Sequence, residues 1–231
     1  MGLTTDFKDN PIGFLGRYIV VVQDEREDEP KEEPVNFVLR RVNSAIEGNN
    51  YIFLVKRTPM NKTVDPGEDI LAYWLPWKKG KANVLTLGDK ARFMFTSEMT
   101  NCRFSVLTGD MAKPLVSHVE GTGSSSKRDE FEVKAGFLAR KDDTEKRMRR
   151  LSVSGVKNPT RDTSDITTPK HQYFGQDGTE KSSAFVFGYR KDTTWKFYAQ
   201  IVKGVMAGDG INALKKATEK VVPLDQAYEI A

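Results

Sequence analysis

The segment Ala91–Gly123, ARFMFTSEMTNCRFSVLTGDMAKPLVSHVEGTG, contains the only cysteine of the chain, Cys102, and one of its two histidines, His118. Three short apolar runs with the composition of strands divide it: Arg92–Thr96, Arg103–Leu107 and Pro114–Val119. The turn sequence Thr108-Gly109-Asp110 follows the second run. A hairpin over the second and third runs would bring Cys102 and His118 together, so we expect the fold to be arranged around this segment.

A thiol and an imidazole are the minimum pair for nucleophilic catalysis, because the imidazole takes the thiol proton and the thiolate attacks. Both residue types also serve as ordinary structural residues, cysteine as a small buried hydrophobe. Asn101 tolerates a left-handed backbone, which lets the chain turn and present Cys102 and its N–H, an oxyanion donor, to a cleft. His171, in a polar stretch typical of the surface, is a second candidate partner.

The spacing of these residues resembles a known family. Thr96 is followed after five residues by Cys102, which closes Met99-Thr100-Asn101-Cys102, and a histidine lies on the next expected strand. This pattern resembles the catalytic region of the cysteine-dependent glutamine deamidases: the cytotoxic necrotizing factor catalytic domain, the Burkholderia lethal factor and the chemotaxis receptor glutamine deamidase. The toxin members have Leu-Ser-Gly-Cys at the motif, so Asn101 replaces a glycine. The resemblance concerns this segment and not the whole chain.

The resemblance implies a protein-glutamine deamidase. Cys102 would attack the carboxamide carbon to form a thioester, His118 would deliver the proton to departing ammonia, and Thr96 would orient the imidazole. Thr100 and Asn101 would complete the motif around the oxyanion. Water would then hydrolyse the thioester without any metal or cofactor, and an amine arriving first would give transglutamination instead. The resemblance further implies a bacterial toxin or effector, secreted without a classical signal peptide or delivered to the host cytoplasm. Its substrate would be a host protein, for which small GTPases or a translation factor are precedents.

Two other classes of function stay open. A cysteine protease would use the same pair on a backbone amide. A noncatalytic protein-interaction module would use aromatic and basic surfaces and would not need Cys102.

Composition describes a globular protein and excludes some classes. Apolar residues make up 38% of the 231 residues and charged residues 29%, and the net charge is only +4. Nucleic-acid binding is not expected without a concentrated basic face. No apolar run approaches the roughly twenty residues that span a bilayer, so no stable membrane association is expected. A single cysteine excludes an internal disulfide and a cysteine-rich metal site. We expect one catalytic domain over 1–231, acting as a monomer.

The remaining apolar runs predict an α+β fold, with a mainly antiparallel sheet or β-sandwich core flanked by a few helices. Further strands are expected at 17–23, 35–41, 51–57 and 82–87, and the clearest hairpin at 183–190 and 193–203. The aromatic run at 70–77 is expected to pack against the sheet, with a substrate cleft or binding surface as the alternative. A turn is expected at 13–16, and 128–141 fits strand or helix. Helices are expected at 142–151 and 208–222, and a long loop at 152–181.

Overall fold

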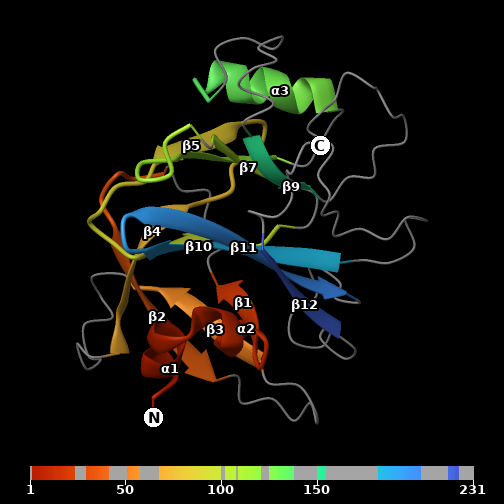
Figure 1. The fold of residues 1–231 in the computed structure, drawn as a ribbon. Coiled ribbons are helices and arrows are strands. Elements are labelled where there is room, and N and C mark those ends of the chain that lie inside the picture. The colour runs from red at the N-terminus through yellow and green to blue at the C-terminus, as the bar shows by residue number, and fades with distance from the viewer. Residues whose placement is uncertain are drawn as a thin grey trace, which may run out of the picture.

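The computed structural model describes residues 2–23, 30–41, 51–57, 68–99, 102–107, 109–120, 125–137, 150–154, 182–203 and 218–223. Over these residues the chain forms two stacked β-sheets with helices on their outer faces (Figure 1). The predicted α+β class is confirmed.

The larger sheet has eight strands in the order β1-β3-β2-β4-β6-β10-β11-β12. The pairs β1/β3 and β4/β6 are parallel and the other pairs are antiparallel. Its strands are β1 (Ile19–Gln23), β2 (Val35–Arg41), β3 (Tyr51–Lys56), β4 (Ile70–Leu75), β6 (Phe93–Thr96), β10 (Ser182–Lys191), β11 (Thr194–Lys203) and β12 (Thr218–Pro223).

The smaller sheet has four antiparallel strands in the order β5-β8-β7-β9. They are β5 (Ala82–Thr86), β7 (Arg103–Leu107), β8 (Leu115–Val119) and β9 (Arg150–Ser154). The predicted hairpin of the Cys102 segment is therefore confirmed, since β7 pairs with β8.

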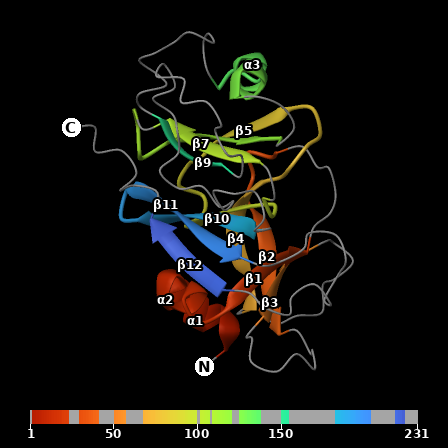
Figure 2. The same cartoon turned by 90° about the vertical axis from the view of Figure 1, so that its right-hand side faces the viewer.

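Two short helices, α1 (Leu3–Asp9) and α2 (Pro11–Leu15), cover the outer side of the larger sheet, and α3 (Ser125–Lys134) covers the smaller one. Figures 1 and 2 show the resulting order of layers from α3 through the two sheets to α1 and α2. One apolar core lies between the sheets and a second lies between the larger sheet and the N-terminal helices.

Strand β10 separates the two cores because its side chains alternate. Ala184 and Val186 belong to the core between the sheets, whereas Phe185 and Phe187 belong to the core under α1 and α2. The β10–β11 hairpin is the one predicted, and its turn has Asp192 at φ 57°. Asp is among the few residues other than glycine that adopt this left-handed backbone readily.

The secondary structure differs from expectation at three places among the described residues. The expected turn at 13–16 is mostly helix α2, which Asn10 caps by accepting a 2.9 Å hydrogen bond from the Gly13 N–H, with Pro11 in the first turn. The expected helix at 142–151 ends in β9, and the loop expected at 152–181 begins there. Positions 142–149 and 155–181 lie outside the described residues.

The third correction concerns the expected helix at 208–222, whose last residues form the edge strand β12. Here Val221 and Val222 lie opposite Gln200 and Ala199 of β11. An amphipathic pattern is a local property, and pairing with an available sheet edge outweighs it for β-branched residues. The earlier part of that segment lies outside the described residues.

Candidate functional site

The β7–β8 register places Cys102 and His118 on one face of the smaller sheet. In the β7–β8 pair, Phe104 lies directly opposite His118, and Arg103 lies opposite Val119. Cys102 is one residue before β7, so the same register puts it opposite Glu120. Cys102 and Phe104 share a face because they are two residues apart, and Phe104 and His118 share it because they are opposite. Cys102 is thus the diagonal cross-strand neighbour of His118, a position from which longer side chains reach one another.

This face of the smaller sheet lies against the larger sheet. Cys102 and Phe104 both belong to the core between the sheets. Cys102 is 4% exposed and His118 is 1% exposed. Just before the cysteine, Met99 exchanges backbone hydrogen bonds of 2.8 and 2.9 Å with Ala184 of β10. The chain therefore passes from the larger sheet to the smaller one immediately before Cys102, and the thiol lies at the junction of the sheets.

The imidazole of His118 is buried between its two neighbours across the smaller sheet. Asn83 of β5 lies opposite it on one side and Phe104 on the other. Neither ring nitrogen makes a hydrogen bond of normal geometry with a described residue. Burial lowers the pKa of His118 to about 4, and the nearby carbonyl of Leu75 offsets this only in part. At neutral pH the buried ring is therefore uncharged.

Thr96 ends the central strand β6 of the larger sheet and is fully buried. Its hydroxyl donates a 3.2 Å hydrogen bond to the carbonyl of Val186 on β10. Thr96 pairs with Leu75, so the backbone carbonyl near the imidazole belongs to its neighbour on β4. The predicted motif residues Thr100 and Asn101, and the alternative partner His171, lie outside the described residues.

The opposite face of the β7–β8 hairpin has a buried ionic network. Arg103, which follows Cys102, donates hydrogen bonds to Asp129 at 2.8 Å and Glu132 at 2.6 Å, both on α3. Ser117, which precedes His118, donates to the other oxygen of Glu132 at 2.7 Å. All four side chains are buried, and Glu132 is 0% exposed.

The Glu132 carboxylate thus bridges β7, which begins directly after Cys102, and β8, which contains His118. This network was not among the features expected from the sequence. Its signal was Arg103 and Ser117 inside otherwise apolar strands, followed by two acids three residues apart, Asp129 and Glu132, on what proves to be one helix face.

The described residues hold no group of three or more His, Cys, Asp or Glu side chains arranged to bind a metal ion. Over the same residues, no helix combines the length and the apolar character needed to cross a membrane.

Comparison with known proteins finds a structural similarity. No protein-family model matches the chain, and no curated protein matches it. Among solved structures, it is similar to the C-terminal domain of CNFy from Yersinia pseudotuberculosis, with a TM-score of 0.46 and 10% sequence identity over 95% of this chain and 98% of that one. A similarity this loose concerns the general arrangement of strands and helices and does not extend to individual residues.

Proposed function

We propose that the protein hydrolyses glutamine side-chain amides of another protein, with Cys102 as nucleophile and His118 as its proton acceptor. The observation that carries the proposal is the placement of these two residues as diagonal neighbours on one face of β7 and β8. The pair would work as a unit, because a free thiol is a weak nucleophile until a neighbouring base takes its proton.

The burial of His118 determines when it can take this role. An imidazole with a pKa of about 4 is neutral at physiological pH but is a weak base, so it takes the thiol proton only once water or substrate reaches the ring and its pKa rises toward 6.5. A buried polar group without hydrogen-bond partners costs stability, and such groups are often kept for chemical reasons. In the proposed reaction the Cys102 thiolate attacks the carboxamide carbon, and the C–N bond breaks as His118 returns the proton to the departing ammonia. Water then splits the thioester to release a glutamate side chain.

The reaction requires access to the sulfur. At 4% exposed, Cys102 meets a substrate only after the groups that cover it move. We propose that binding of the protein substrate opens this face. The resemblance to toxin deamidases suggests a host protein as substrate, such as a small GTPase or a translation factor, and delivery of the enzyme to the host cytoplasm.

Peptide mass mapping of candidate proteins tests the proposal. Small GTPases and translation factors are incubated with the wild-type protein, with Cys102→Ser and with a matched control, Ser105→Ala. Ser105 lies on β7 but on the face away from the pair, and its hydroxyl has no partner among the described residues. Wild type and Ser105→Ala should convert particular glutamines to glutamates, whereas Cys102→Ser, with an unchanged melting temperature, should not.

Each contrary result points to a defined alternative. Cleaved targets that depend on Cys102 would identify a protease. A protein that binds its target equally well with Cys102→Ser and leaves every glutamine unchanged would be an interaction module, and the catalytic assignment would be wrong.

A further inference from the structure

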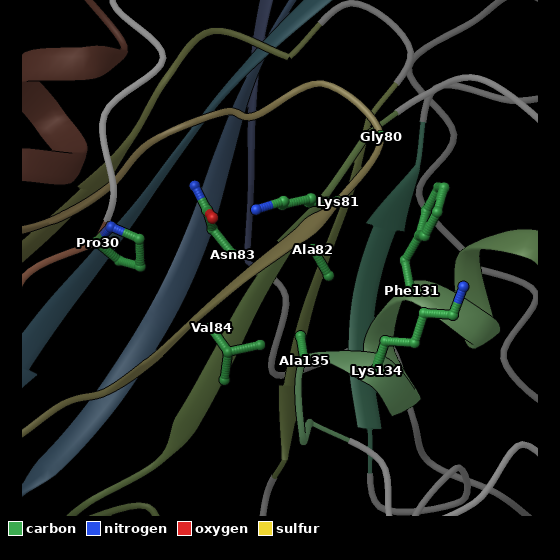
Figure 3. Close-up of a pocket in the computed structure, with 9 residues that line it drawn as sticks. All are labelled: Pro30, Gly80, Lys81, Ala82, Asn83, Val84, Phe131, Lys134 and Ala135. Atoms are coloured by element: carbon green, nitrogen blue, oxygen red, sulfur yellow. The ribbon is translucent and has the colours of Figure 1, made fainter.

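A pocket of about 500 Å³ lies along the outer edge of the smaller sheet, at strand β5. Figure 3 shows Pro30 on one side of it and residues of α3 on the other, with the turn and strand of β5 between them. Its volume is in the range of ordinary ligand sites. It is lined by Pro30, Gly80, Lys81, Ala82, Asn83, Val84, Phe131, Lys134 and Ala135.

The pocket lining combines apolar side chains with Asn83 and two lysines on opposite faces of the sheet edge: Lys81 is on the face of Asn83, and Lys134 is on α3, which covers the other face. Lys81 precedes β5 and Lys134 ends α3, and no acidic residue lines the pocket. Within the described residues neither lysine forms an ion pair. A third cation, Lys127, lies 5.8 Å from the centre of the Phe131 ring. Charge complementarity therefore favours an acidic ligand with apolar parts.

The pocket also borders a free strand edge. Strand β5 is the last strand of the smaller sheet, and no described strand pairs with its outer side. Glu120 donates its N–H to the carbonyl of Lys81, so every second residue from Lys81 directs its backbone toward β8. The intervening residues direct their N–H and C=O groups outward: Ala82, Val84 and Thr86. Such an edge is a template for an added strand.

We propose that this pocket and the β5 edge together bind an extended acidic segment of a partner protein. The segment adds to the smaller sheet through the outward backbone groups of Val84 and its neighbours. Because side chains of a strand alternate between the two faces of a sheet, acidic residues at one set of positions meet Lys134 on the α3 side, and those at the intervening positions meet Lys81 on the other side. This site does not depend on the chemistry of Cys102, and its binding is measured without any turnover.

Fluorescence anisotropy with labelled peptides tests the site. A peptide with glutamates at consecutive positions, flanked by valines, should bind the whole protein, and binding should weaken as salt is added. The same peptide with glutamine in place of glutamate should bind more weakly. Lys81→Glu and Lys134→Glu should each weaken binding about fivefold or more, the effect of losing one partly exposed charge pair. Lys113→Glu, an exposed lysine in the loop before β8, should leave binding unchanged.

Strand addition has its own tests. Val84→Pro removes an N–H that points outward and should weaken binding while leaving the pairing with β8 intact. If that variant does not fold, a peptide N-methylated at alternate residues gives the same information with the wild-type protein, because it cannot donate to the edge. Equal binding of the glutamate and glutamine peptides, or no effect of either lysine variant, would overturn the proposal. Two such peptides exist, one N-methylated at the odd positions and one at the even positions. If both bind as tightly as the unmethylated peptide, the proposal is overturned as well.

Discussion

At the scale of the residue, His118 is the side chain whose environment departs most from that of the free amino acid. Its folded pKa of about 4 lies below the ordinary value of 6.5. Between these two values the unfolded chain binds a proton that the folded protein excludes. The free energy of unfolding should therefore be fully retained above pH 6.5 and decrease as the pH falls toward 4.

This difference in pKa predicts a pH dependence that belongs to one residue. The contribution of His118 amounts to about 3 kcal/mol between pH 7 and pH 4. The His118→Phe variant should lack this contribution. In urea unfolding experiments, the free energy of unfolding of the wild type should therefore fall by about 3 kcal/mol more than that of the variant between pH 7 and pH 4. Parallel curves for the two proteins would show that His118 is protonated in the folded state or exposed to water.

Cys102 gives a second prediction at the same scale. Since it is the only thiol, alkylation by iodoacetamide reports on this position alone. Buried as it is, the sulfur should react much more slowly in the native protein than in urea-unfolded protein. Addition of a true protein substrate should accelerate the native reaction or protect the thiol. A native rate equal to the unfolded rate would contradict the buried position.

At the scale of the element, the β7–β8 hairpin is held from both sides, by apolar packing on the Cys102 face and by α3 on the other. The link to α3 is the Glu132 carboxylate, which accepts from Arg103 on β7 and Ser117 on β8. Removing one member of a buried charge network leaves its partners unpaired in a dry environment. The hairpin and α3 should therefore lose stability together.

Glu132→Ala should accordingly lower the free energy of unfolding by about 3–5 kcal/mol, measured by urea denaturation. Glu132→Gln should cost less, because its amide oxygen still accepts from Ser117 while Arg103 keeps Asp129. Glu130→Gln, on the exposed side of the same helix, is the matched control and should change little. Similar small losses for all three variants would mean that the network contributes no stability.

At the scale of the whole molecule, one amide joins the N-terminal segment to the far part of the larger sheet. Gln200 of β11 donates 2.7 Å hydrogen bonds to the carbonyls of Leu15 and Tyr18 and accepts one of 2.9 Å from the N–H of Val20. The Gln200 side chain is 0% exposed, so water cannot take its place as the hydrogen-bond partner of these backbone groups. Residues about 180 positions apart are thereby held together.

Gln200→Ala should destabilise the protein by about 3 kcal/mol, since it leaves buried backbone groups unpaired. Hydrogen exchange should show loss of protection first in α1, α2 and β1. Lys196→Ala, at an exposed position of the same strand, is the control and should leave exchange unchanged. Loss of protection confined to β11 would contradict a link between the two ends of the chain.

The alternation of apolar residues was enough to predict most strands, including the three of the Cys102 segment and the β10–β11 hairpin. It was also enough to place Cys102 and His118 on paired strands, because a short turn between two strands leaves few other arrangements. The segment 218–222 shows the limit of this reasoning. Its helical periodicity is a local signal, and the edge of β11 that it pairs with is formed by other parts of the chain.

The sequence by itself thus determined the class of fold and the neighbouring strands that carry the thiol and the imidazole, since both follow from short-range patterns. Only the tertiary structure decided that this face is buried between two sheets, that Glu132 joins the strands from the opposite face and that no described strand pairs with the outer edge of β5. Burial and charge pairing depend on which distant segments stack together, and no local pattern encodes that choice.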